Sequence, residues 1–225
     1  MNLTSPSQVR ALVADIGFEP SKLLGQNFLI DRNILDIIVR TADLRASDRV
    51  LEVGPGLGVV TEQLAARAAQ VVAVEKDKRL FGYLAEKFRD VRNIQLINAD
   101  MLDVNPDDFT RAGVRKLVSN LPYSVGSRVL VDMLMAEITP DLIVVTVQLE
   151  VARRLVAEPH KKDYGVLSVW AQTGYDMEIV KSVSPACFWP KPEVTSAIVS
   201  FRKKDRFPLT REQKKFLFII TKKLF

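Results

Sequence analysis

The chain has 225 residues, of which 48% are apolar and 26% charged, an ordinary balance for a globular protein. Its 32 Lys and Arg residues exceed its 27 Asp and Glu residues, so the net charge is +5. A single cysteine and a single histidine exclude a disulfide framework and most metal sites, and no apolar run is long enough to span a membrane or to act as a secretory signal. We therefore expect a cytoplasmic protein with no metal and no membrane partner.

Asp31–Ala42 is predicted to form a helix with Asp31 as its N-cap, after a loop with the sequence SKLLGQNFLI. From residue 49 onward, apolar runs of strand length alternate with helical patterns. The predicted strands are Arg49–Val53, Val71–Glu75, Ile94–Asn98, Lys116–Ser119 and Leu142–Val147. The predicted helices are Val59–Arg67, Lys78–Phe88, Val125–Leu134, Leu149–Ala157 and Gly165–Gln172. This alternation indicates an α/β protein with a mostly parallel sheet covered on both faces.

Two further strands, Met177–Val183 and Thr195–Phe201, flank the sequence SPACFWPKPE, whose three prolines argue against regular structure between them. We expect this pair to extend one edge of the sheet in antiparallel fashion. Thr210 and Gln213 then form the pattern of a capping box, which predicts a helix that runs to Phe225.

Residues 181–225 carry 11 basic and 3 acidic side chains, so all of the net positive charge lies there. Such density is typical of a surface that binds a polyanion, because phosphate contacts release counterions. A solvated helix face is the alternative.

A glycine loop, Glu52-Val-Gly54-Pro-Gly56-Leu-Gly58, follows the first strand. It differs from the dinucleotide fingerprint because its third glycine comes one residue early. Glu52 would also repel a pyrophosphate. Gly54 and Gly56 allow close backbone approach to a ligand, and the acidic residue favours a cationic or zwitterionic one, such as S-adenosyl-L-methionine.

Carboxylates end the next two predicted strands. Glu75 is the last residue of the second strand and can accept two hydrogen bonds from a ribose diol. Asp100 follows the third strand and can accept one from an adenine amino group. Either residue alone could be a solvated carboxylate with no role. The glycine loop, Glu75 and Asp100 at three successive strand ends together favour an adenosine-containing cofactor.

The fourth strand ends in Asn120-Leu121-Pro122-Tyr123. The side-chain carbonyl of Asn120 and the backbone carbonyl of Leu121 can hold the N–H bonds of an exocyclic amine and favour a nucleophilic nitrogen. Pro122 stiffens the turn. Tyr123 can stack on a base that has left its helix. The alternative is a rigid turn with no chemical role.

Eight segments in this order resemble one known family. They are GQNFL (25–29), LEVGPGLGVVT (51–61), VEKD (74–77), NAD (98–100), NLPY (120–123), QLEVARRLVA (148–157), YGVLSV (164–169) and FWPKPEVTSA (188–197). The resemblance is to the ribosomal RNA small-subunit adenine N6,N6-dimethyltransferases of the KsgA/RsmA type, to which the erythromycin-resistance rRNA methyltransferases are related. It implies a class I S-adenosylmethionine-dependent methyltransferase fold. It also implies dimethylation of two adjacent adenosines in a hairpin loop near the 3′ end of small-subunit rRNA.

The resemblance also assigns roles to individual residues. It implies cofactor contacts at Asn27, Leu29, Gly54, Glu75, Asp100 and Asn120. It implies a grip on the target adenine by Asn120, Leu121 and Tyr123, with Phe188 as a second stacking aromatic. The alternative for Phe188 is that it packs under its proline-rich loop. For Trp189 we prefer this packing role. Lys203, Lys204 and Arg206 are the candidate RNA contacts.

Three parts of the chain are expected: an N-terminal arm with a cofactor-covering loop (1–30), a methyltransferase domain (31–205) and the first helix of a truncated or incomplete C-terminal helical domain (206–225). The expected partner is small-subunit rRNA or an immature 30S particle, bound by a monomer. Three alternatives remain open: a large-subunit enzyme of the erythromycin-resistance type, a DNA amino-methyltransferase, and an assembly factor with secondary catalysis.

Overall fold

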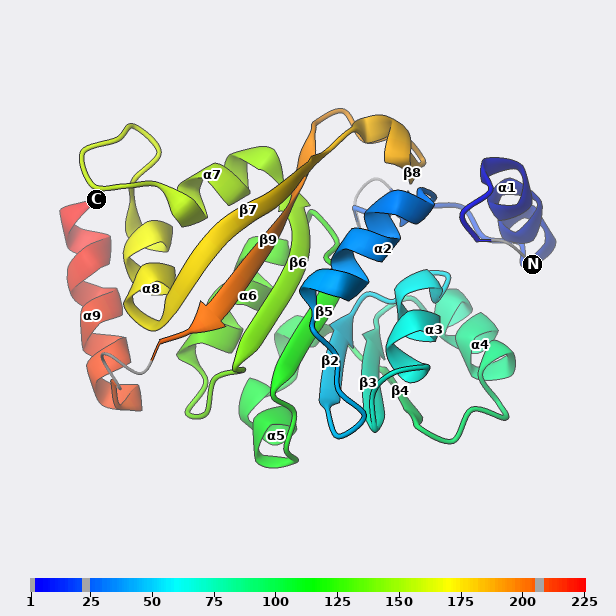
Figure 1. The fold of residues 1–225 in the computed structure, drawn as a ribbon, viewed down its shortest axis with the longest axis horizontal. Coiled ribbons are helices and arrows are strands. Elements are labelled where there is room, and N and C mark those ends of the chain that lie inside the picture. Colours follow the sequence, from blue (N-terminus) through cyan, green and yellow to red (C-terminus); the bar gives the residue numbers. More distant parts are fainter. Residues whose placement is uncertain (1–2, 22–24, 205–208) are drawn as a thin grey trace.

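The computed structural model describes residues 3–21, 25–204 and 209–225. Its centre is a seven-stranded sheet with the order β4-β3-β2-β5-β6-β9-β7 (Figure 1). The bounds are β2 Arg49–Val53, β3 Gln70–Glu75, β4 Ile94–Asn98, β5 Lys116–Asn120, β6 Leu142–Gln148, β7 Tyr175–Val183 and β9 Ser196–Lys203. All seven strands predicted from the apolar runs are present, with ends within two residues of the prediction.

The first five of these strands are parallel, and β9 runs antiparallel to both β6 and β7. The late antiparallel addition to one edge is therefore confirmed. Burial on both faces explains why the strand sequences lack alternation: in β6 every residue from Leu142 to Val147 is buried.

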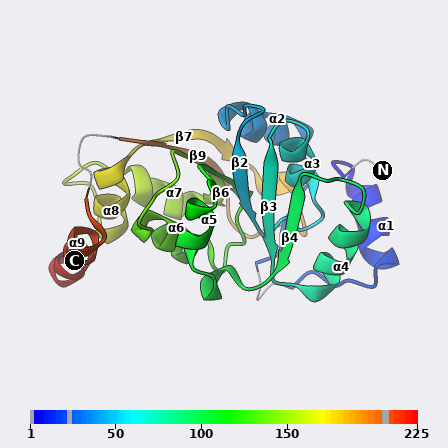
Figure 2. The same cartoon turned by 90° about the horizontal axis from the view of Figure 1, so that it is seen from below.

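Helices cover both faces of the sheet, as Figure 2 shows from below. On one face, α2 (Arg32–Thr41) and α3 (Val59–Ala65) pack in a core that includes Ile38, Leu64 and Val118. On the other face, the core includes side chains of α5 (Pro106–Arg111), α6 (Gly126–Met135), α7 (Leu149–Val156) and α8 (Val166–Gly174). Asp31 caps α2 as predicted, since its carboxylate accepts from the N–H of Ile34 at 3.0 Å.

An N-terminal arm lies at the end of the molecule that carries α4 (Lys78–Lys87). Its helix α1 (Pro6–Asp15), which the sequence did not predict, joins a small core that contains Phe28, Leu57 and Leu80. The arm therefore packs against the residue that follows Gly56 and against the helix after β3.

The proline-rich segment is more regular than its sequence indicated, which corrects the prediction. It contains a 3-10 turn (Pro185–Cys187) and a short strand, β8 (Phe188–Trp189), which pairs with β1 (Phe28–Leu29). Phe188 and Trp189 retain their N–H groups, and Trp189 precedes a proline, which favours extended backbone.

The C-terminal helix α9 (Arg211–Leu224) begins with the predicted capping box of Thr210 and Gln213. It lies beside α8 at the end of the molecule opposite α1 (Figure 1), and Phe218 stacks on Trp170 at 3.7 Å between ring centroids. Phe216, Ile219 and Leu224 are exposed. In the three described ranges, no helix is long and apolar enough to cross a membrane, and no group of three His, Cys, Asp or Glu side chains is arranged to hold a metal.

Candidate active site

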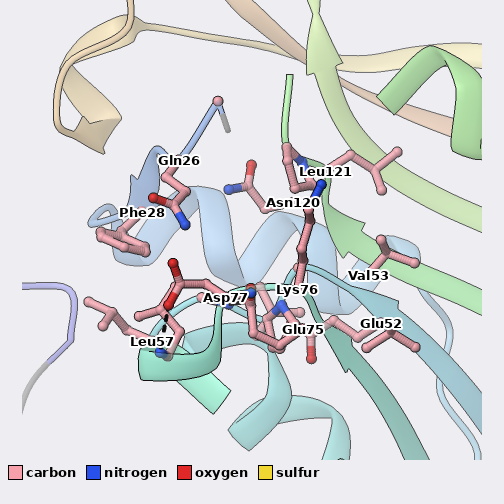
Figure 3. Close-up of a pocket in the computed structure, with 18 of the residues that line it drawn as sticks. Gln26, Phe28, Glu52, Val53, Leu57, Glu75, Lys76, Asp77, Asn120 and Leu121 are labelled. Atoms are coloured by element: carbon pink, nitrogen blue, oxygen red, sulfur yellow. Dashed lines mark hydrogen bonds between the residues drawn. The ribbon is translucent and has the colours of Figure 1, made fainter. Parts of the chain in front are cut away.

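A pocket lies at the carboxyl ends of the parallel strands, where the strand order reverses between β2 and β5. Such a switch point is where open α/β sheets bind ligands. The pocket is lined by the loops after β2, β3, β4 and β5 and by the segment 25–29, and Figure 3 shows Glu52, Glu75 and Asn120 among its side chains. The topology thus brings together the candidate residues from all four strand ends.

Two glycines of the loop after β2 meet other parts of the pocket at close range. Gly54 has φ +68°, and a Cβ there would lie 2.8 Å from Cγ of Pro122. Gly56 has φ +58°, and its Cβ would lie 3.0 Å from the ring of Phe28. Both positions need a residue without a side chain, because the backbone is left-handed and the space is filled.

Glu75 is 5% exposed and points into the pocket. One carboxylate oxygen accepts from the N–H of Asp77 at 2.8 Å, and the other accepts from the N–H of Gly56 at 3.2 Å. Burial raises the pKa of Glu75 to about 7, because desolvation outweighs these hydrogen bonds. Each oxygen keeps a lone pair for a second donor.

Glu52 lies deeper and is 1% exposed. Its carboxyl accepts from the hydroxyl of Thr61 at 2.7 Å. Burial raises the pKa of Glu52 to about 8, and the nearby Glu75 adds to the effect while Lys87 opposes it. The pocket therefore contains two carboxyl groups that a bound cation would help to ionise.

Asp100 sits at the edge of the pocket and forms an ion pair with Lys76, with 2.6 Å between Nζ and Oδ2. Its other oxygen accepts from the N–H of Leu102 at 3.0 Å. The Lys76 hydrogen bond is the main reason that the pKa of Asp100 is lowered. Lys76 belongs to the quoted VEKD motif, but its contact with Asp100 follows only from the pairing of β3 with β4.

Asn120 ends β5 with its amide in a fixed orientation. Its Nδ2 donates to the backbone carbonyl of Asn27 at 3.0 Å. Its Oδ1 is buried and accepts no hydrogen bond from the described residues. A buried acceptor without a partner is unfavourable by about 1–3 kcal/mol, so this oxygen is a strong candidate for a ligand contact. The side chain of the neighbouring Leu121 is buried, which leaves only its backbone for a contact with substrate.

Tyr123 and Phe188 lie edge to face, with 6.4 Å between ring centroids and 76° between ring planes. The Tyr123 hydroxyl is hydrogen-bonded to that of Ser196, at the start of β9. Phe188 is only 2% exposed, which agrees with the alternative interpretation that it packs under its proline-rich loop. Leu29 pairs with Phe188 across the two-stranded sheet, and Trp189 packs on Phe28, in the structural role preferred for it.

The candidate RNA contacts lie far from this pocket. Strand β9 runs from Ser196, beside Tyr123, to Lys203, a length of about 23 Å at roughly 3.3 Å per residue. Lys203 lies 3.7 Å from a carboxylate oxygen of Asp141, and Lys204 lies 2.8 Å from one of Asp176. Arg206 lies outside the described residues.

Two residues with clear geometric roles were not singled out from the sequence. Ser196 holds the Tyr123 hydroxyl, and Gly25 packs against the backbone of Tyr123 and Ser124. Both belong to quoted motifs, GQNFL and FWPKPEVTSA, but only the fold shows that the two motifs meet the loop after β5.

A seven-stranded sheet of this order, with one antiparallel strand and a pocket at the switch point, defines a Rossmann-like class I methyltransferase. More narrowly, the chain belongs to the ribosomal RNA adenine dimethylase family, whose sequence pattern matches residues 17–225.

Individual relatives agree with this assignment. The ribosomal RNA small subunit methyltransferase A of Levilactobacillus brevis is 41% identical over 226 residues, which cover 98% of this chain and 76% of that protein. The crystal structure of a dimethyladenosine transferase from Plasmodium falciparum has a TM-score of 0.76 at 25% identity, and covers 86% of this chain and 70% of that one. The 23S rRNA methyltransferase ErmE has a TM-score of 0.70 at 33% identity, with 87% and 78% covered.

Proposed function

We propose that this protein uses S-adenosyl-L-methionine to dimethylate N6 of two adjacent adenosines in a hairpin loop near the 3′ end of 16S rRNA, within an immature 30S particle. The observation that carries the proposal is the buried Oδ1 of Asn120, which has no hydrogen-bond partner among the described residues. Asn120 lines a pocket whose other strand ends suit an adenosine-containing cofactor. Family membership supports the same reaction. The chain is expected to act as a cytoplasmic monomer.

The pocket fits the cofactor by the chemistry of its groups. S-adenosyl-L-methionine supplies an electrophilic methyl group on a positively charged sulfonium. Glu75 is placed to accept the ribose hydroxyls, and Asp100 to accept from the adenine amino group. Gly54, Gly56, Asn27 and Leu29 also line the pocket, and the two glycines let Pro122 and Phe28 pack against the loop after β2. Two buried carboxyl groups favour a cationic ligand over a pyrophosphate.

Asn120 and Leu121 would prepare the nucleophile. The lone pair of an adenine amino group is delocalised into the ring, which makes the nitrogen a poor nucleophile. Acceptance of its two N–H bonds by Oδ1 of Asn120 and the Leu121 carbonyl favours a pyramidal nitrogen with a localised lone pair. When bound, S-adenosyl-L-methionine would supply the methyl group and leave as the neutral thioether, and the nitrogen would lose one proton to water in each transfer. Both acceptors would hold N–H bonds in the first transfer, and one N–H bond would remain for the second. Pro122, held against Gly54, keeps the two acceptors in place.

Tyr123 and Phe188 would hold the target adenine after it leaves its stack. The two rings pack edge to face beside each other, and Ser196 is hydrogen-bonded to the Tyr123 hydroxyl. Lys203, Lys204 and Arg206 would contact the backbone of a more distant part of the RNA, because β9 separates the lysines from Tyr123 by about 23 Å.

A transfer assay with radiolabelled cofactor tests the proposal. The substrates are 30S particles that lack the modification, naked 16S rRNA, 23S rRNA and DNA duplexes. We expect label on the 30S particles, and N6,N6-dimethyladenosine after digestion. Label on 23S rRNA alone would favour the erythromycin-resistance type of activity, and label on DNA alone would favour a DNA enzyme. RNA binding without any transfer would identify an assembly factor.

A further inference from the structure

We propose that Gly25 is a positioning residue for methyl transfer: its lack of a side chain lets the segment 25–29 dock on the loop after β5, so that the Asn27 carbonyl sets the orientation of the Asn120 amide. The inference rests on the proposed function, because it concerns the same acceptor. It assigns a role to a residue that touches neither the cofactor nor the adenine in the mechanism above.

The first step is the close approach at Gly25. Its φ is +63°, and a Cβ there would lie 2.8 Å from the backbone nitrogen atoms of both Tyr123 and Ser124. These neighbours are backbone atoms of a proline-stiffened turn, so they cannot move aside as a flexible side chain would. Any side chain at position 25 therefore separates the two loops.

The second step leads from Gly25 to Asn27. The Asn27 side chain donates from Nδ2 to the carbonyl of Gly25 at 3.2 Å, which ties the two residues of the segment together. A displacement of Gly25 therefore moves Asn27 as well. Beyond Asn27, the segment continues into β1, where Leu29 pairs with Phe188.

The third step fixes the acceptor. The Asn27 backbone carbonyl can only accept, so the Asn120 amide must present Nδ2 to it, at 3.0 Å, and must turn Oδ1 the other way. If that carbonyl moved away, nothing in the described contacts of Asn120 would choose between the two amide orientations. In the flipped orientation the Asn120 NH₂ group would face the N–H bonds of the adenine amino group. Both groups are hydrogen-bond donors, so no hydrogen bond could form.

The variant Gly25→Ala tests the proposal, and Gly17→Ala is its matched control. Gly17 has φ +60°, so alanine there brings the same backbone strain, but no atom lies within 4 Å of its Cβ position. We expect the single-turnover rate of Gly25→Ala, at saturating cofactor and 30S substrate, to fall at least tenfold below that of Gly17→Ala. The side-chain amide signals of Asn120, assigned in ¹⁵N spectra, should shift in Gly25→Ala and stay unchanged in the control.

Equal rates for the two variants would overturn the proposal. A loss of cofactor affinity with a wild-type rate at saturation would also overturn it, because Gly25 would then serve the cofactor alone. If Gly25→Ala unfolds, Asn27→Ala removes the link to Gly25 without adding atoms, and a wild-type saturated rate there overturns the proposal. Absence of transfer by the wild type contradicts the proposed function instead, and the amide signals still test the position of Asn120.

Discussion

The pocket has two halves that are built in different ways. The cofactor half consists of the loops after β2, β3 and β4, and three of its hydrogen bonds join nearby parts of the chain: Glu52 to Thr61 across 9 residues, Gly56 to Glu75 across 19, and Lys76 to Asp100 across 24. The target half consists of Asn120–Tyr123 with the segments that hold it. Its contacts join Asn120 to Asn27 across 93 residues and Tyr123 to Ser196 across 73.

The two halves therefore differ in the sequence separation of the segments that must pack together to form them. These three hydrogen bonds of the cofactor half arise within one strand–helix unit or between two successive units, so they form wherever those units pair. Its long-range contacts are the packing of Gly54 against Pro122 and of Gly56 against Phe28. The target half needs the N-terminal arm, the β5 loop and the start of β9 in place together. Changes in the two halves should therefore affect different measurements, namely the methyl-transfer rate for the target half and ligand affinity or pH dependence for the cofactor half.

The largest effect is expected for Asn120→Ala, in the target half. Loss of one positioned acceptor should lower the single-turnover rate by about 10²–10³, by analogy with removal of one oxyanion-hole donor. RNA affinity, measured by filter binding, should change far less. The exposed Asn33→Ala on α2 is the control. A rate within threefold of wild type would remove Asn120 from the mechanism.

The second effect is expected for Glu52→Gln, in the cofactor half, and concerns stability. Burial in the folded protein raises the pKa of the Glu52 carboxyl from the ordinary 4.5 to about 8. Between pH 4.5 and pH 8, Glu52 is therefore protonated in the folded protein and ionised in the unfolded chain. The stability of the wild type relative to Glu52→Gln should thus fall as pH rises from 4.5 to 8, on the order of 1 kcal/mol per pH unit.

Urea unfolding of both proteins at pH 5 and pH 8 measures the Glu52 effect. Glutamine keeps the acceptor for Thr61 and cannot ionise, so the difference between the two proteins isolates one group. A difference that is the same at both pH values would show that Glu52 does not titrate in this window.

The third effect is expected for Glu75→Ala, also in the cofactor half. Loss of its contacts should weaken cofactor binding by about 1–3 kcal/mol in calorimetry. The wild-type affinity should rise with pH through about 7, because a cationic ligand with hydroxyl donors prefers the ionised carboxylate. The exposed Glu86→Ala on α4 is the control. Unchanged affinity in Glu75→Ala would refute the ribose assignment.

The smallest effect is expected outside both halves. Replacement of Lys203 and Lys204 by Gln should reduce the slope of log K against log[salt] for RNA binding by about 1–2, at up to roughly 0.9 per phosphate contact. Cofactor affinity should not change. The slope should fall equally for RNAs of different sequence, since phosphate contacts do not read bases. An unchanged slope would mean that these lysines only form their ion pairs with Asp141 and Asp176.

The sequence predicted the pocket residues best where each one lies at the end of a single predicted strand. The apolar runs located the strands, and the residues at or just after the end of each strand line the pocket because parallel strands end at the same edge. Prediction failed where distant segments meet. No periodicity links Tyr123 with Ser196 or Asn27 with Asn120, and the β1–β8 pairing involves only two residues on each side. Helix α1 was not predicted, although Val9, Leu12 and Val13 have helical spacing and form its buried face.

Capture of an adenine beside the edge-to-face pair of Tyr123 and Phe188 involves two separate penalties. Because the two rings are in contact, a base that stacks on Tyr123 must first displace part of that contact. An adenine in a duplex must in addition break its own pair and its stacking with neighbours. Only the second penalty depends on the RNA, and it is smallest for a nucleotide that is already unpaired. The cost of removing a base from its stack therefore discriminates against helical adenines before any base edge is read, and it favours an unpaired nucleotide at the tip of a hairpin.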